Sequence, residues 1–142
     1  MITNTLKFSQ VKVLEELKAP TYESGPHYIT GIMDEEGLYA FRCSSCRKKL
    51  AVPLVKQIKH RWAGKSPSMS GDLQEDLKRF YMIGILNKSH EGGNPVFDRI
   101  SCPTCAQEYA TYCGVGEVNQ SAYFVQVQGI LKIQKQSNRI AS

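Results

Sequence analysis

The clearest pattern in the chain is a two-residue alternation of apolar and polar side chains over residues 123–134. This alternation predicts a long antiparallel strand with one side buried and one side in water. Gly129 interrupts the run and indicates a bulge or a bend. The apolar side of the expected strand is formed by Tyr123, Val125, Val127, Leu131 and Ile133. The polar side is formed by Gln126, Gln128, Lys132 and Gln134.

Shorter apolar runs predict further strands. Residues 6–17 mix strand and helix patterns, and we favour a strand. Residues 28–33 and 38–43 are rich in β-forming side chains and flank the sequence Asp-Glu-Glu-Gly, which predicts a hairpin. Residues 108–113 predict another strand, and residues 137–142 are expected to form a flexible tail.

Two helical patterns fall within residues 53–95. The first is a short helix with one apolar face, formed by Val55, Ile58 and Trp62. The second begins at Asp72, which forms a variant of the capping box with Glu75. The stripe along the second helix consists of Leu73, Leu77, Phe80, Tyr81 and Gly84.

The five cysteines indicate that this β-rich chain binds a metal ion. Four of them form two units, Cys43-Ser-Ser-Cys46 and Cys102-Pro-Thr-Cys105. A Cys-x-x-Cys turn aims both sulfurs at one point, and two such turns supply the four thiolates that a tetrahedral zinc ion prefers. Cys43, Cys46, Cys102 and Cys105 are therefore the predicted ligands of one structural zinc ion. A redox pair and an iron or iron–sulfur site are the alternatives to zinc.

Residues 38–51 and 98–113, which carry the two units, resemble the zinc-ribbon superfamily. In that superfamily two knuckles at the tips of two β-hairpins clamp one ion. The sequence departs from the family at Arg47 and Ala106, where glycine is common, and in the 55 residues between the units. The resemblance implies an α+β fold: an antiparallel β-sheet with a four-cysteine zinc ribbon and a helical insertion, residues 53–95, between the two zinc knuckles.

Other chemistry-bearing side chains offer no catalytic set. Cys113 is expected in the core, because free cysteine is among the most buried residue types. His27, His60 and His90 do not lie at ligand spacing from either unit. The protein fills all four metal positions, so no coordination site stays open for catalysis. The chain is therefore expected not to be an enzyme, and no small-molecule substrate is evident.

Length and composition fit a single globular domain over residues 1–142. The chain is 42% hydrophobic and 22% charged, which excludes a disordered or fibrous protein. No apolar run approaches the roughly 18 residues of a membrane span, and the N-terminus has no basic leader followed by an apolar stretch. We expect a cytoplasmic protein without a membrane partner.

The net charge of +5 is concentrated in one segment, because residues 37–71 contain eight cations and no Asp or Glu. A local basic block favours an anionic partner. The candidate nucleic-acid-binding residues are Arg47, Lys48, Lys49, Lys56, Lys59, Arg61 and Lys65. The alternative is that cations near the first unit, including Arg42, offset the charge of −2 on a zinc ion with four thiolates. Trp62, beside these cations, fits a core anchor better than a stacking platform.

Two functions remain open. The first is a nucleic-acid-binding zinc ribbon. The alternative is a protein–protein interaction module, such as an adaptor, a regulator, or an inhibitor or immunity-type protein. The strand at residues 123–134 favours the alternative if it lies at a sheet edge, where another chain can pair with it.

Overall fold

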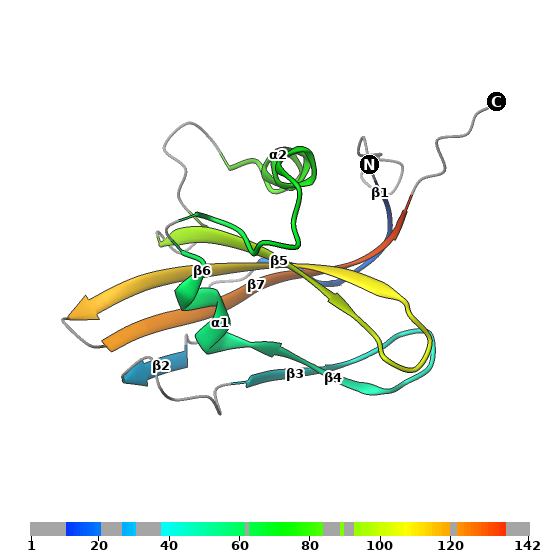
Figure 1. Cartoon of the computed structure of the whole chain (residues 1–142), viewed down its shortest axis with the longest axis horizontal. Coiled ribbons are helices and arrows are strands. Elements are labelled where there is room, and N and C mark those ends of the chain that lie inside the picture. Colours follow the sequence, from blue (N-terminus) through cyan, green and yellow to red (C-terminus); the bar gives the residue numbers. More distant parts are fainter. Residues whose placement is uncertain are drawn as a thin grey trace.

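The computed structural model describes residues 11–20, 27–30, 38–61, 63–83, 89, 93–119 and 122–135. The chain is mostly β with two short helices (Figure 1). The strands are β1 (Val11–Lys18), β2 (His27–Thr30), β3 (Leu38–Arg42), β4 (Lys49–Pro53), β5 (Asn94–Ser101), β6 (Glu108–Asn119) and β7 (Ala122–Lys135). The helices are α1 (Leu54–Lys59) and α2 (Gly71–Phe80).

The main sheet is antiparallel and has the strand order β1-β7-β6-β5. Strand β2 pairs with residues 122–125 of β7, while β1 pairs with residues 130–135 along the same edge of β7. The long strand predicted from the alternation is therefore central and paired on both edges. The condition under which this strand would favour a protein partner, a position at the sheet edge, is therefore not met.

A bulge at Gly129 confirms the interruption predicted there and shifts the phase of the alternation. The register of β6 against β7 steps from Cys113↔Val127 to Tyr112↔Gly129, so that Gln128 is the extra residue. The side chains of β7 therefore change face at this point. Tyr123, Val125, Val127 and Ile130 join one core cluster, and Leu131 and Ile133 join the other. The single apolar side expected for residues 123–134 is wrong, and Gln126 and Gln128 are buried.

Different elements pack against the two faces of the main sheet (Figure 1). On one face lie α1 and the hairpin of β3 and β4, which bury Leu50, Val52, Leu54 and Ile58 against the sheet. On the other face lies α2, whose apolar stripe is buried as predicted through Leu73, Leu77 and Tyr81. The N-terminal cap of α2 is Ser70 and not the expected Asp72, because the Ser70 side chain accepts a hydrogen bond of 3.1 Å from the backbone N–H of Leu73.

The segment between the two Cys-x-x-Cys units crosses from one face of the sheet to the other. After α1, residues 64–66 run along the free edge of β5, with Phe97 N–H donating to Gly64 O at 3.0 Å and Ser66 N–H donating to Phe97 O at 2.9 Å. The chain then enters α2 on the opposite face. The expected insertion at residues 53–95 thus contains both helices and covers both faces. Trp62 and His90 lie outside the described residues.

The hairpin predicted for residues 28–33 and 38–43 is wrong. Residues 27–30 pair with β7, whereas β3 pairs with β4 in the register Leu38↔Pro53 to Arg42↔Lys49. The physical reason is packing. Pairing with β4 brings Tyr39 and Phe41 against the core on the same face as the buried side chains of β4.

None of the described helices is long and apolar enough to cross a membrane. Residues 137–142, expected as a tail, and residues 6–10 of the first predicted strand lie outside the described part of the chain.

Candidate metal centre

The first Cys-x-x-Cys unit closes the hairpin of β3 and β4. Strand β3 ends at Arg42 and β4 begins at Lys49, so the turn spans residues 43–48. The backbone N–H of Cys43 donates to Lys48 O, and the N–H of Arg47 donates to Cys43 O, each at 2.8 Å. The turn is therefore held by two hydrogen bonds of its own backbone.

The second unit repeats this geometry at the end of β5 and the start of β6. The backbone N–H of Cys102 donates to Gln107 O at 2.9 Å, and the N–H of Ala106 donates to Cys102 O at 2.8 Å. The flanking residues pair in the same way, Ser101 with Glu108 as Arg42 with Lys49. Two segments far apart in the sequence thus form equivalent turns at the tips of two hairpins.

Arg47 and Ala106 adopt the left-handed backbone conformation that usually favours glycine. Their φ angles are 71° and 66°. A side chain in this region costs roughly 1–2 kcal/mol, because Cβ approaches the following carbonyl oxygen. Arg47 and Ala106, at positions where glycine would be free of this cost, therefore add local backbone strain to the two turns.

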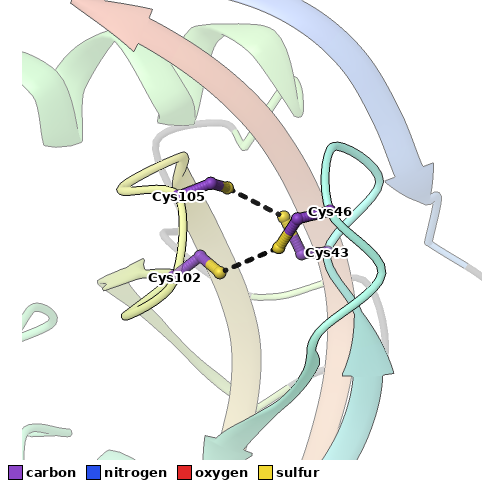
Figure 2. Close-up of side chains that lie close together, drawn as sticks. All are labelled: Cys43, Cys46, Cys102 and Cys105. Carbon is purple, nitrogen blue, oxygen red and sulfur yellow. Dashed lines mark hydrogen bonds between the residues drawn. The ribbon is translucent and has the colours of Figure 1, made fainter.

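The two turns bring all four cysteine sulfurs together (Figure 2). The Sγ atoms lie within 4.8 Å of one another, with Cys43 and Cys105 at 3.6 Å and Cys46 and Cys102 at 3.5 Å. A tetrahedral ion with metal–sulfur bonds of about 2.3 Å needs sulfurs about 3.8 Å apart, and the observed distances bracket this value. The predicted ligands thus form one cluster that can hold a metal ion.

Burial differs between the four thiols. Cys43 and Cys102 are buried, Cys46 is partly buried and Cys105 is exposed. Beside Cys105 a hollow of about 320 Å³ is lined by Gln107, Ile133 and neighbouring residues. The cluster is therefore closed on the side of the core and accessible from the second turn.

Tyr109, on β6, contacts the candidate metal site and was not singled out from the sequence. Its hydroxyl accepts a hydrogen bond from the Ser44 backbone N–H at 2.9 Å and donates to Cys43 Sγ at 3.2 Å. The ring is fully buried and stands edge-on to Phe41, with centroids 5.4 Å apart. Tyr109 therefore joins the second hairpin to the first turn. No local sequence pattern identifies it, because its partners lie 65 and 66 residues away.

Hydrogen bonds favour the ionised form of the first cysteine of each unit. Burial raises the pKa of Cys43, but the Tyr109 hydroxyl and the backbone N–H groups of Cys46 and Ser45 outweigh burial and lower it from 9.0 to about 6. Burial likewise opposes ionisation of Cys102, whose pKa is nevertheless lowered by backbone N–H groups of its own turn and by the neighbouring thiols.

The second cysteine of each unit shows the opposite shift. The Gln107 backbone N–H lowers the pKa of Cys105, but burial and the three neighbouring sulfurs raise it to about 12. The pKa of Cys46 is also raised, since burial and the nearby sulfurs outweigh the Lys48 N–H. Four thiolates without a cation repel one another, whereas a divalent metal ion at the centre would favour all four.

The predicted cationic residues fall into two groups, one at each end of β4. The first group surrounds the first turn, where Arg42, Arg47, Lys48 and Lys49 are all exposed. The second group surrounds α1 and comprises Lys56, Lys59, Arg61 and Lys65. The structure thus divides the basic block of the sequence into a metal-end group and a helix group.

Several side chains of the helix group are engaged within the protein. Lys56 lies 3.5 Å from the carboxylate of Asp98, which is fully buried. Arg61 is only 12% exposed, pairs with Glu117 at 3.7 Å and lies 5.0 Å from the ring centre of Tyr123. Lys59 is exposed, and Lys65 is partly buried beside β5.

Cys113 is completely buried in the core, as predicted, and is not part of the metal cluster. His60 is likewise outside the cluster, and burial lowers its pKa. The side chains of His27 and His90 lie outside the described part of the structure.

No protein-family model matches the chain, no curated protein matches its sequence, and no solved structure matches its fold. What the protein does must therefore be inferred from the four-cysteine cluster and the surface around it.

Proposed function

We propose that the chain is a zinc-ribbon protein in which Cys43, Cys46, Cys102 and Cys105 hold one structural zinc ion. The observation that supports this most is the meeting of four sulfurs from two equivalent hairpin turns. Backbone N–H groups and the Tyr109 hydroxyl that point at the sulfurs are the outer-shell contacts that such a site needs. Iron takes the same ligands, so metal analysis tests the choice.

The zinc ion would act as a cross-link within the fold. Strands β3 and β4 form a sheet of their own, and no described residue pairs them with the main sheet. The hairpin is held by side-chain packing against one face, and a zinc ion would also tie its tip to the second turn (Figure 2). Since four protein ligands fill the coordination sphere, the ion has a structural and not a catalytic role.

We further propose that the protein binds nucleic acid through its basic segment. The exposed group of Arg42, Arg47, Lys48 and Lys49 carries four positive charges beside the first turn. A zinc ion with four thiolates carries a formal charge of −2, which leaves this end of the molecule positive. Near the second turn, Arg99 is paired with Glu108 and adds no net charge. Phosphate groups are the natural counterpart of such a surface.

A protein partner is the second candidate, but the structure does not provide the edge strand at residues 123–134 that would have favoured it. The long strand β7 pairs with β6 along one edge and with β1 and β2 at the two ends of the other, so it lies inside the sheet and not at its edge. The protein-interaction module therefore becomes an outcome of the binding test.

Metal analysis of the purified protein tests the first part. We expect close to one zinc per chain in the wild type and none in a variant with Cys43→Ser and Cys102→Ser. Cys113→Ala is the matched control, because it removes a buried thiol outside the cluster and should keep the zinc. A wild-type protein that contains iron, or no metal when purified without chelator, would contradict the proposal.

Fluorescence anisotropy with labelled single- and double-stranded DNA and RNA tests the second part. Removing the charges of Arg47, Lys48 and Lys49 by substitution with Ala should reduce the logarithmic salt slope by about 2–3, since each phosphate contact contributes about 0.7–0.9. Alanine at Lys12 and Lys78, on β1 and α2, provides a control outside the basic segment. Absence of binding to every probe at about 50 μM protein would refute nucleic-acid binding and favour a protein partner.

A further inference from the structure

The hairpin of β3 and β4 has an outer face that differs sharply from its inner face. Directly opposed residues of an antiparallel pair lie on the same face. Two such pairs, Tyr39↔Val52 and Phe41↔Leu50, point into the core. The three pairs of the outer face are Leu38↔Pro53, Ala40↔Ala51 and Arg42↔Lys49.

The outer face is exposed along β3 and at Lys49, while Ala51 and Pro53 on β4 are partly buried, and its chemical character changes along its length. Leu38, at the end near α1, is 54% exposed, and Ala40 in the middle is also exposed. Arg42 and Lys49 lie opposite each other at the metal end, and Lys48 continues the positive charge into the turn. The face therefore has small methyl groups at its centre and cations at one end.

The contacts of the two cationic groups favour the hairpin over α1 as the phosphate-binding part. Lys56 and Arg61 of the helix group are engaged with Asp98 and Glu117. Arg42, in contrast, uses one N–H to hold Arg47 O at 3.0 Å, and a guanidinium group has five N–H donors. Lys59 and the 47% exposed Lys56 still reach solvent beside α1, but all four cations at the tip of the hairpin are exposed, so more charge is available to a ligand on the hairpin.

The aromatic side chains of the hairpin argue against a single-stranded ligand on this face. Proteins that bind single strands stack bases on exposed aromatic rings. The rings of Tyr39 and Phe41 instead face the core. The outer face offers methyl groups and cations, which suit base edges and phosphates.

We propose that this hairpin enters the major groove of double-stranded DNA as a two-stranded ribbon, with its outer face against the bases. This inference rests on the proposed nucleic-acid binding. Two strands about 4.8 Å apart fit a groove about 12 Å wide, which admits a β-ribbon. The methyl groups of Ala40 and Ala51 let the ribbon approach base edges, while Arg42, Lys48 and Lys49 meet phosphates at the metal end. The deep and narrow major groove of double-stranded RNA excludes such a ribbon.

Anisotropy titrations with a DNA duplex of about 20 base pairs, the matching RNA duplex and the DNA single strand test the ligand class. We expect the DNA duplex to bind at least about tenfold more tightly than either of the others. Tighter binding to RNA duplex or to single strands would overturn the ribbon proposal and leave nucleic-acid binding in place. Absence of binding to all three probes would overturn both.

Two matched pairs of variants test the surface. Arg42→Ala with Lys49→Ala and Lys56→Ala with Lys59→Ala remove the same charge from opposite ends of β4. We expect only the first pair to lower the salt slope, by about 1.8 for two duplex phosphates. Equal effects of the two pairs would overturn the assignment to the hairpin.

A substitution at the centre of the outer face provides a test that removes no cation. Ala40→Glu introduces bulk and negative charge at the centre of the outer face, and we expect it to weaken duplex binding at least about tenfold. Ala63→Glu makes the same change at an exposed position after α1 and should bind like the wild type. Both variants must retain zinc and the wild-type circular dichroism spectrum. Wild-type DNA binding by a folded Ala40→Glu variant would overturn the proposal.

Discussion

The hydroxyl of Tyr109 is expected to tune metal affinity, and Tyr109→Phe removes it with little change in shape. The hydroxyl accepts from the Ser44 N–H, so its one proton is directed to Cys43 Sγ, 3.2 Å away. This arrangement favours the thiolate, in agreement with the lowered pKa of Cys43. Phenylalanine would keep the buried ring and its edge-on contact with Phe41.

The magnitude follows from the bonds that are lost. A hydrogen bond to a charged acceptor contributes about 1.5–3 kcal/mol. The second lost bond, from the Ser44 N–H, adds little to the free-energy change, because Ser44 is exposed and its N–H can donate to water instead. The metal-free Cys43 thiolate accepts the same bond, so only part of this free energy enters the zinc dissociation constant. Since each 1.4 kcal/mol is a factor of ten in an equilibrium constant, zinc binding should weaken by at most about 10- to 100-fold. Changes in the outer shell of metal sites have effects of this size.

Competition with a chromophoric chelator at constant pH gives the zinc dissociation constant of each variant. Tyr112→Phe is the control, because Tyr112 is equally buried on the same strand but packs on the opposite face, against α2. We expect Tyr112→Phe to alter stability without changing the zinc dissociation constant. A constant for Tyr109→Phe within about twofold of the wild type, or equal losses in the two variants, would refute the role assigned to this hydrogen bond.

Three further predictions concern the backbone and the protons of the site. Gly129→Ala should destabilise the protein by about 1–3 kcal/mol in denaturant unfolding, because the new Cβ would lie 2.7 Å from Cζ of Tyr81; Gly71→Ala, with no atom within 4 Å of its Cβ, should cost nothing. Ala106→Gly should raise the unfolding free energy of the zinc-bound protein by about 0.5 kcal/mol, since relief of left-handed strain exceeds the entropy cost of glycine, and a lower value would contradict the strain argument. The pKa is raised for the second cysteine of each unit, to about 12 for Cys105, so these thiols keep their protons at pH 7–8 in the metal-free protein. Zinc must displace at least these two protons, so the logarithm of its affinity should rise by at least about two per pH unit in this range; calorimetry in buffers of different ionisation enthalpy that shows fewer than two protons released would contradict this.

The candidate metal site was predictable from the sequence because its geometry is local. A Cys-x-x-Cys turn fixes the relative position of two sulfurs within a few residues, whatever the rest of the chain does. The apolar stripe of α2 was predictable for the same reason, since residues three and four apart share one face of a helix. Both patterns depend only on residues that are close together in the sequence, and both are found in the structure.

Strand pairing and side-chain partners were decided only by the tertiary structure. One extra residue beside Gly129 moves Leu131 and Ile133 to the other face, because side chains alternate with a period of two. Residues 27–30 pair with β7, and no local pattern selects between edges that are distant in the sequence. Tyr109 acquires its role only when the two hairpins meet. The sequence determined which atoms can bind a metal, and packing between distant segments decided which residues surround them and which surface they leave exposed.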